Sequence, residues 1–593
     1  MNITPESESG KTDEQAPAQP PRFASRKTWL DLLLVLVLLA VATLILVDFS
    51  GLTIRRLGAR HAAATLDFHQ RHQFFDVQYN HARYECKLPF PFWLMSVPVF
   101  LLGSSDMALR VVSELFGMGL VLMTYCLGKK LFNRTVGFFA ALAAVINVLH
   151  PWVVRHSLID TSAHFLIGLA VVFFYLGWQN PERRKLYVFL FYAASAVATW
   201  HRGPLGFVLP GITVTAVLVP LGQWRTLRQF LNPLAILMWL VLVVPYFLAL
   251  GWNHLDQTFI TENLLHFIQG EASHDETSSS RPPYYWPVMF LFRYLPWSGF
   301  FLLSLVYAAK RRVSPDRSAL WFVAAWFGSW FLFWHLAAAR NETYLLALVI
   351  PTSLFVGYLL AGLWRSAGTV VDSTAKEVWV TFSFVALVAT AAGMPLAMLM
   401  TDCPDFSMLM WGGVTGALAL LGLAVVILAL MLDYRRALVV GLCLSVVSLV
   451  VVGFFVNPAV DQTRPGREFF TYARELVGNR PVVIYGSDKL GRLSHEFHSI
   501  VLYLRSPHPV TVLSSPAKIR KKWKELRDPT SLTTRTGLAV FSPEGGRKDL
   551  TGLKPKVKPV RREDDSGAYL LYSHPKPRNV SQADPSAKVA PHD

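Results

Sequence analysis

The sequence contains many long runs of apolar residues, and these runs decide what kind of protein the chain can form. Each run has about 18–25 residues, the length of a helix that crosses the hydrocarbon core of a bilayer. The composition agrees, because 53% of the 593 residues are hydrophobic and only 16% are charged. A water-soluble chain of this length would carry more charge. We therefore predict an all-α, polytopic membrane protein.

We expect about thirteen transmembrane helices. The first, over 29–49, lacks a small-residue cleavage site, so we expect an uncleaved anchor rather than a signal peptide. The apolar segment 90–103 is short for a span and contains prolines, so we expect it to be interfacial or re-entrant. The other expected spans lie near 108–127, 135–152, 161–177, 185–200, 204–221, 231–251, 285–309, 318–337, 343–363, 378–400, 408–432 and 437–456.

The basic loops determine the expected topology. If 90–103 does not span, six basic loops fall on the same side as the N-terminus, which is the cytoplasmic side by the positive-inside rule. If it spans, all six move outside. These loops are "GKKLFNR", "NPERRK", "GQWRTLRQ", "KRRVSPDR", "LWRS…AK" and "DYRR". We therefore expect a multi-pass protein of the cell (inner) membrane, with a cytoplasmic N-terminus and the remaining polar segments outside.

This topology also explains the net charge of +17 without nucleic acid as a partner. The bilayer is the expected environment, and nothing in the sequence indicates an oligomeric state. Four scattered cysteines favour neither a disulfide framework nor a zinc site: Cys86, Cys126, Cys403 and Cys443.

The two ends of the chain differ from the apolar middle. Residues 1–28 are rich in Pro, Glu, Ser and Gln, which is typical of a disordered cytoplasmic tail. Residues 29–456 form the expected membrane domain. Residues 457–575 mix helical and strand patterns, with "PVVIYG" as a buried strand, and predict a small extracytoplasmic α/β domain. Residues 576–593 are expected to be a second disordered tail.

The first outer loop, 50–89, is unusually long for a compact membrane protein, which is a hint of function. Its residues 57–72 have helical spacing and mixed polarity, as expected of a helix on the membrane surface. Tyr84 and Lys87 then stand directly before the interfacial segment. A cation at that depth suits a lipid-linked phosphate. The alternative is simple anchoring by snorkelling side chains and tyrosine.

Further polar residues stand at the outer ends of spans. Asp160 begins a span, where it could be a helix cap or part of an active site. Arg202 could bind a ligand or simply mark a helix end. Arg340 and Tyr344 stand at the start of another span. The polar loop 252–284 could be a lid over an outer cavity or a plain disordered loop.

The order of these motifs resembles the GT-C superfamily of integral-membrane glycosyltransferases. The chain is most similar to the bacterial branch that includes aminoarabinose transferases and relatives of protein O-mannosyltransferases. The resemblance covers residues 29–364 by motif and the rest by architecture only. The segment "YECKLPFPFW" (84–93) resembles the family's "Y-x-x-K-P-P-x-x-x-W", with Leu88 replacing the first proline. "LID" (158–160) resembles an "L-D" element whose Asp belongs to the catalytic cavity.

Other segments follow the same order. "TWHRGPLGFVLPG" (199–211) is similar to the family's "L-T-K-G-P" segment, and "RNETYLLALVIP" (340–351) to its "K-x-x-x-Y-L-L-P" segment. His266 falls where relatives carry Arg. The resemblance implies Asp160 as the first catalytic candidate, and Asp67, which lies later on the expected surface helix, is the second. The substrate-binding candidates are Arg60, Tyr84, Glu85, Lys87, Arg202, His266, Arg340 and Tyr344.

One departure concerns an acid that relatives carry shortly after the first span, about thirty residues before the motif lysine. A gap-free count back from Lys87 reaches Leu57 and Gly58, where no acid stands, although the nearby Arg60 matches. Asp67 and Glu85 are the candidates to replace it.

The resemblance implies a transferase that moves a sugar from a polyprenyl-phosphate-linked donor to lipid A, a glycan or a protein on the extracytoplasmic face. A carboxylate would orient or deprotonate the acceptor hydroxyl, and cations would stabilise the leaving phosphate. No cofactor or metal is expected to be required. One alternative is a lipid-binding pseudoenzyme or subunit of the same fold, which the missing acid favours. A transporter is the other, which the nearly charge-free spans disfavour.

Overall fold

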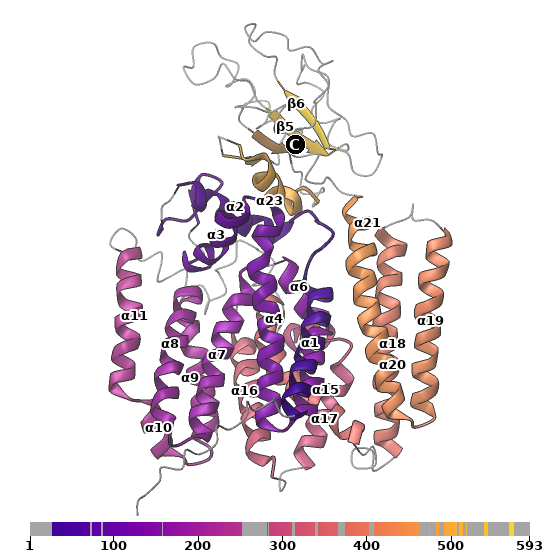
Figure 1. The fold of residues 1–593 in the computed structure, drawn as a ribbon. Coiled ribbons are helices and arrows are strands. Elements are labelled where there is room, and N and C mark those ends of the chain that lie inside the picture. The colour runs from indigo at the N-terminus through magenta and orange to yellow at the C-terminus, as the bar shows by residue number, and fades with distance from the viewer. Residues whose placement is uncertain are drawn as a thin grey trace, which may run out of the picture.

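The computed structural model describes residues 26–71, 74–84, 87–156, 158–251, 282, 284–310, 315–337, 342–365, 374–402, 408–462, 474, 482–485, 492–506, 509–513, 518, 539–543 and 569–573. Helical segments of many lengths, including the 3₁₀ segment η2 and the π segment η4, form the body of the molecule (Figure 1). They are α1 (Arg26–Leu46), α4 (Asp106–Leu131), α5 (Arg134–Val145), α6 (Leu149–His156), α7 (Asp160–Gln179), α8 (Arg184–Arg202), α9 (Leu205–Leu218), α10 (Trp224–Phe230), α11 (Pro233–Gly251), α14 (Tyr285–Arg293), α15 (Ser298–Lys310), α16 (Arg317–Leu336), η2 (Glu342–Leu348), α17 (Val349–Arg365), α18 (Thr374–Asp402), α19 (Met408–Leu430), α20 (Tyr434–Val451), η4 (Val452–Val456) and α21 (Asn457–Gln462).

The helices agree with a protein that crosses the membrane several times. In the described part of the chain, seven helices are long and apolar enough to span a bilayer, or nine if each of two bent pairs is one span. Every predicted span overlaps a helix, a bent pair or two consecutive helical segments. The number thirteen itself stays a prediction, because some of these helices, such as the 14-residue α9, are shorter than a spanning helix.

The two bent pairs each break beside a proline. α5 and α6 meet at 54°, and α14 and α15 at 105°. Pro151 and Pro296 stand at these breaks, where a proline lacks the N–H that would continue the helix. Backbone groups freed inside a membrane need other partners. Asn147 Nδ2 donates to two carbonyls of the preceding turn at 3.1 and 2.7 Å, and Trp297 Nε1 donates to the Ile146 carbonyl.

Several of the basic loops lie together at one end of the bundle. Asp31, near the start of α1, pairs with Lys129 at 2.7 Å and also with Arg134, which follows α4. Arg365 at the end of α17 donates to Asn133 at 2.8 Å. The start of α1 therefore shares an end with the loops after α4 and α17, as the predicted topology requires. Which side of the membrane this end faces stays a prediction.

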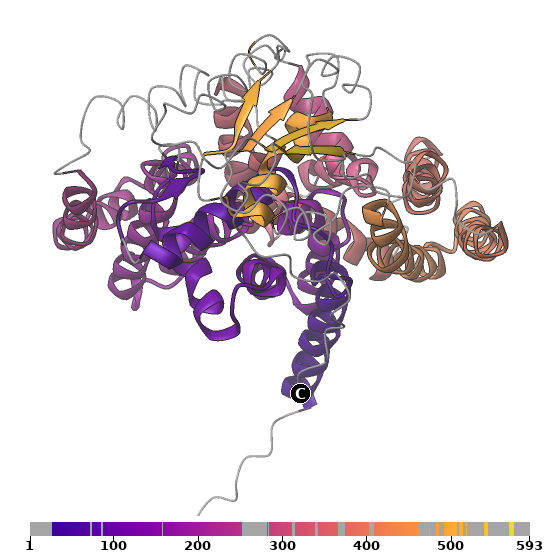
Figure 2. The same cartoon turned by 90° about the horizontal axis from the view of Figure 1, so that it is seen from above.

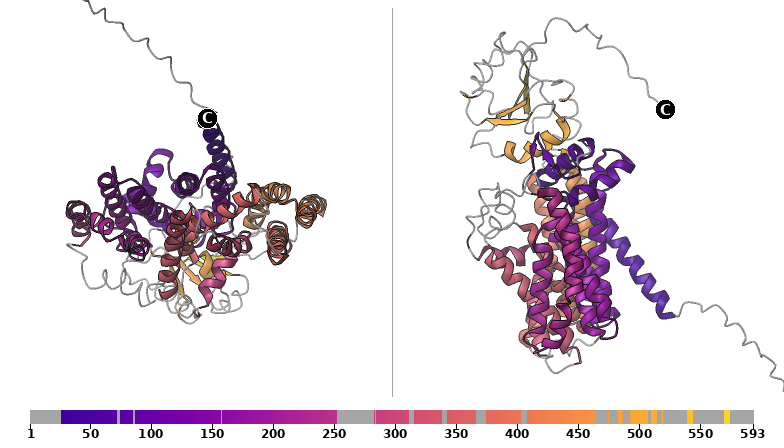
Figure 3. Two further views of the ribbon diagram at one scale, coloured as in Figure 1. Left: turned by 90° about the horizontal axis from the view of Figure 1, so that it is seen from below. Right: turned by 90° about the vertical axis from the view of Figure 1, so that its left-hand side faces the viewer.

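The opposite end carries the first outer loop (Figures 1 and 3). It contains α2 (Arg56–Arg71), the hairpin of β1 (Gln78–Tyr79) and β2 (Ala82–Arg83), and α3 (Phe90–Leu102). α2 matches the helix predicted over 57–72. α3 has 13 residues, roughly 20 Å at 1.5 Å per residue, which is too short to cross a core about 30 Å thick. Its length agrees with the prediction that 90–103 does not span.

A four-stranded sheet lies over the same end, as the view from above shows (Figure 2). Its strands are β3 (Val482–Tyr485), β4 (Thr511–Leu513), β5 (Ala539–Pro543) and β6 (Tyr569–Ser573), in the order β4-β3-β5-β6. β3 is parallel to β4 and β5, and β6 is antiparallel to β5. The helix α23 (Arg492–Leu504) lies between β3 and β4 in the chain, as a parallel pair requires. The bounds predicted for this domain, 457–575, and for the two tails stay predictions.

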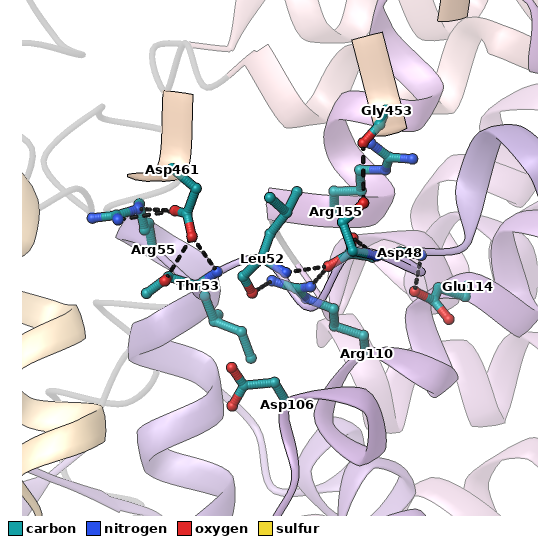
Figure 4. Close-up of polar contacts among 12 residues, drawn as sticks. Asp48, Leu52, Thr53, Arg55, Asp106, Arg110, Glu114, Arg155, Gly453 and Asp461 are labelled. Carbon is teal, nitrogen blue, oxygen red and sulfur yellow. Dashed lines mark hydrogen bonds and ion pairs between the residues drawn. The ribbon is translucent and has the colours of Figure 1, made fainter. Parts of the chain in front are cut away.

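A buried ion pair fastens the end of α1 to α4 (Figure 4). Asp48 pairs with Arg110, and their side chains are only 2% and 6% exposed. The same two side chains hold the turn that follows α1. The Leu52 N–H donates to Asp48 Oδ2 at 3.0 Å, and Arg110 donates to the Leu52 carbonyl at 2.6 Å. Glu114 accepts the Asp48 N–H at 3.0 Å.

Two residues of the C-terminal part hold the next segment, 53–55. Asp461, in α21, accepts the Thr53 N–H at 3.0 Å and pairs with Arg55 at 2.9 Å (Figure 4). Tyr503, in α23, accepts the Ile54 N–H at 2.9 Å and donates to Asp106 at 2.8 Å. Burial raises the pKa of Tyr503, so its hydroxyl keeps the proton that it donates. The first outer loop is thus tied to both α4 and the C-terminal part.

The Asp48–Arg110 pair leads to a prediction about stability. Arg110→Met leaves a buried carboxylate without its cation, so we expect the free energy of unfolding to fall by about 3–5 kcal/mol. Chemical unfolding in mixed micelles measures it. Arg436→Met is the matched control, because Arg436 pairs with Asp433 at 3.4 Å on an exposed surface, and we expect a change below about 1 kcal/mol. Equal losses in both variants would contradict this account.

Candidate functional site

The centre of the candidate site is the ion pair between Asp160 and Arg202. Asp160 is the first residue of α7 and is 2% exposed, and its Oδ1 accepts a hydrogen bond from Arg202 Nη1. Ile159 holds the N-cap position of α7 without a side-chain cap hydrogen bond, and Asp160 is the first helical residue. The Asp160 carboxylate accepts the hydrogen bond from Arg202.

Tight packing at the α8–α9 turn sets the position of Arg202, the last residue of α8. Gly203 follows it with a φ of 62°, a conformation that glycine adopts most readily, and Pro204 precedes α9. α9 starts directly against α8. A Cβ on Gly206 would lie only 2.2 Å from the carbonyl carbon of Ala198. The close packing that Gly203 and Gly206 permit therefore determines the position of the Arg202 guanidinium.

Tyr344, in η2, lies against the other side of this cation. The Arg202 Cζ is 4.9 Å from the Tyr344 ring centre, within reach of a cation–π interaction. The Tyr344 ring stacks on Trp334 with 4.6 Å between centroids. The start of η2 is held by Glu342, which pairs with Arg293 of α14. The structure thus brings together three candidates from separate helices: Asp160, Arg202 and Tyr344.

α2 packs on the turn that leads into Asp160. A Cβ on Gly58 would lie 3.0 Å from the His156 carbonyl oxygen, so glycine permits this close approach. Ala59 and Ala62 of α2 share a core cluster with Ile159. The helix that carries Arg60 therefore lies beside the turn that leads into Asp160.

Arg60 is held by aromatic rings. Its Cζ lies 4.6 Å from the Tyr84 ring centre and 5.4 Å from that of Tyr79. Within the described part of the chain, no carboxylate pairs with Arg60. Aromatic faces hold a guanidinium in place without neutralising its charge. Such a cation is available for an anionic ligand.

The segment that contains Lys87 lies beside the end of α8. Leu88 belongs to a small core cluster against which Trp200 packs. The Phe90 ring lies 6.0 Å from the His201 ring. Lys87 itself is half-buried. The motif lysine and the Arg202 turn are therefore neighbours, although more than a hundred residues separate them in the chain.

The remaining candidates are placed as follows. Asp67 lies two turns after Arg60 on the same face of α2, where its carboxylate pairs with Arg71 at 3.0 Å. Their ion pair lies within one helix. Three candidates, Glu85, His266 and Arg340, lie outside the described residues.

Some residues of this end were not predicted. Asp48 stands shortly after α1. The gap-free count back from Lys87 stops at Leu57 and does not reach Asp48, because such a count assumes loops of equal length. Glu342 lies inside the "RNETY" segment, where an acid could have been noticed. His498, described below, has no local signal, because its partner is 419 residues away.

The metal prediction stays open. No group of three or more His, Cys, Asp or Glu side chains that could hold a metal ion occurs among the residues that the structure describes. That no metal or cofactor is required remains a prediction.

Residues 85–248 match the family described as dolichyl-phosphate-mannose-protein mannosyltransferase. The undecaprenyl phosphate-α-4-amino-4-deoxy-L-arabinose arabinosyl transferase of Yersinia enterocolitica is 25% identical over 274 residues, which are 45% of this chain and 48% of that protein. The Yersinia pestis protein of the same name is 24% identical over 307 residues, 50% and 53% of the two chains. The chain thus spans about half the length of the curated relatives it matches.

Solved structures show a similar fold. ArnT from Cupriavidus metallidurans bound to undecaprenyl phosphate matches with a TM-score of 0.68 and 15% identity, over 92% of this chain and 98% of that one. The Archaeoglobus fulgidus oligosaccharyltransferase in the apo form matches with a TM-score of 0.50 and 11% identity, over 93% and 76%. At these identities the likeness concerns the fold.

The tight α8–α9 turn leads to a second prediction. Gly206→Ala places a Cβ inside the backbone of α8, so we expect the free energy of unfolding to fall by about 1–3 kcal/mol. Gly211→Ala, on the same helix, is the matched control, because no atom lies within 4 Å of the added Cβ. Thermal unfolding in detergent measures both. A Gly206→Ala protein as stable as the control would show that α8 and α9 do not meet this closely.

Proposed function

Because the motifs, the family match and the fold identify this chain as a GT-C-type membrane protein, we propose that it transfers a sugar from a polyprenyl-phosphate carrier to an acceptor. The acceptor is a lipid such as lipid A, a glycan or a protein. The protein resides in the cell (inner) membrane, and the end with Asp160 faces away from the cytoplasm. The basic loops gathered at the opposite end support this orientation.

One observation carries the proposal. Asp160, Arg202 and Tyr344 come from three helices and meet at one end of the bundle, beside the segment with Lys87 and below the helix with Arg60. A carboxylate paired with a cation at the end of a candidate membrane span, with further cations on neighbouring segments, suits a substrate with a lipid tail and a charged phosphate head. Transport would instead place charges near the middle of the spans.

The chemistry requires a base and an anion-binding group. The bond between the sugar C1 and the phosphate oxygen breaks, and polyprenyl phosphate leaves with the electron pair. A new bond forms between C1 and the acceptor oxygen, whose proton goes to the Asp160 carboxylate. Arg202 orients this carboxylate, and Lys87 stabilises the charge that develops on the leaving phosphate. Arg60 binds the phosphate group, which is charged both in the donor and in the transition state. Tyr344 supports the guanidinium of Arg202.

The central prediction concerns Asp160. Asp160→Asn removes the base but keeps the shape of the side chain, so we expect the transfer rate to fall by about 10²–10⁴-fold. The assay uses purified protein in liposomes with a panel of polyprenyl-phosphate sugars, and follows the release of polyprenyl phosphate. Asp433→Asn, an exposed acid at the opposite end, is the control and should keep full activity. Thermal unfolding checks that both variants fold.

Two results would oppose the proposal. Sugar-dependent release that survives in folded Asp160→Asn would exclude Asp160 as the base. Release that fails with every donor in the wild-type protein would exclude the transferase activity for the donors tested.

A second candidate function has its own observation. Asp48 pairs with Arg110 and Asp67 pairs with Arg71, so these two acids, the ones among the described residues that could replace the missing acid, are occupied in ion pairs. A lipid-binding homologue without transferase activity would show this arrangement. Saturable binding of undecaprenyl phosphate that depends on Lys87, with no sugar transfer, would favour this second function.

A further inference from the structure

The C-terminal part docks on the hairpin of the first outer loop. The Asn80 side-chain amide forms two hydrogen bonds with the backbone of Val510. Asn80 Nδ2 donates to the Val510 carbonyl oxygen at 2.9 Å, and the Val510 N–H donates to Asn80 Oδ1 at 2.8 Å. The His81 Nε2 lies 2.8 Å from the Ser506 carbonyl oxygen. Asn80 and His81 have φ values of 54° and 64°, which place the tip of this tight hairpin in a left-handed turn. The tip is thus shaped to meet the C-terminal chain.

A second contact reaches deeper, toward the candidate site. The Tyr79 Oη lies 2.6 Å from Nδ1 of His498, which is in α23, and the two rings are 5.6 Å apart. Burial, and then the nearby Arg60, lower the pKa of His498 to about 4. Burial raises the pKa of Tyr79. Near neutral pH the histidine is therefore neutral and the tyrosine is protonated, so the Tyr79 hydroxyl donates to Nδ1.

This hydrogen bond fixes a ring that faces Arg60. Tyr79 and Tyr84 are the two rings near the guanidinium, and their centroids are 5.9 Å apart. Tyr84 belongs to the first outer loop, as Arg60 does. The hydroxyl of Tyr79 has its partner in a helix more than four hundred residues away. The position of Arg60 thus depends in part on the C-terminal region.

We propose that His498 is a positioning residue for the donor phosphate, acting through Tyr79 on Arg60. The proposal rests on the proposed function, in which Arg60 contacts the phosphate of the lipid carrier. The C-terminal region then completes the donor site rather than merely covering it. Because the phosphate is charged both in the bound donor and in the transition state, a loosened Arg60 weakens binding in both states. The KM for the donor rises, and kcat changes little.

The test compares two substitutions of one side chain in the full-length protein in liposomes. His498→Phe keeps a ring against Tyr79 but cannot accept the hydrogen bond from its hydroxyl. We therefore expect the KM for the donor to rise about three- to ten-fold, which is the scale of one hydrogen bond. His498→Asn restores an acceptor near the place of Nδ1 and should return KM to within about two-fold of the wild type. The Kd of undecaprenyl phosphate is measured in parallel.

His81→Asn is the matched control. It removes a contact to Ser506 that holds the same C-terminal chain, and asparagine tolerates the positive φ of this position. A role for His498 in docking alone would make His81→Asn raise KM as much as His498→Phe does. The proposal instead predicts an unchanged KM in His81→Asn.

The outcomes separate the two proposals. A wild-type protein that transfers sugar, with His498→Phe unchanged in donor KM and Kd, would overturn the role of His498 and leave the transferase intact. A wild-type protein that neither transfers sugar nor binds undecaprenyl phosphate would overturn both. A rise in KM with His498→Phe, recovered in His498→Asn and absent in His81→Asn, supports the positioning role.

Discussion

Charged side chains are costly inside the hydrocarbon of a bilayer, and this constraint arranges the whole molecule. Two groups of the described ion pairs lie at opposite ends of the bundle. Asp31 meets Lys129 and Arg134 at one end, while Asp160 meets Arg202 at the other. A buried charge that loses its partner destabilises the fold strongly. The location of the charged side chains and their pairing with opposite charges therefore determine where a charged ligand can be bound.

The end with Asp160 is built from distant parts of the chain. Small residues let α2 lie on the turn before α7 and let α9 begin against α8. The C-terminal part is tied to the first outer loop at several places, among them Asp461, Tyr503 and His498. In this arrangement the loop cannot move far without the C-terminal part. The candidate site is thereby held by contacts on several sides.

The sequence predicted much of this arrangement, because its strongest signals are local. Apolar runs identified the helices, and the basic loops identified 90–103 as a segment that does not span. The order of motifs indicated the GT-C resemblance and the candidates Asp160, Arg202 and Tyr344. The bends at Pro151 and Pro296 were missed, because helix breaks inside a membrane depend on partners such as Trp297. The contact of Tyr79 with His498 joins residues 419 positions apart and leaves no pattern in either segment.

The most direct test of the central claim is to map where the lipid phosphate binds. An undecaprenyl phosphate analogue with a photoreactive group near its head is cross-linked to the protein in liposomes, and the labelled peptides are identified by mass spectrometry. The account predicts labels in the segments around Lys87, Asp160 and Arg202, with unlabelled undecaprenyl phosphate as a competitor. Competed labels at the opposite end, around Lys129 and Arg134, would contradict it.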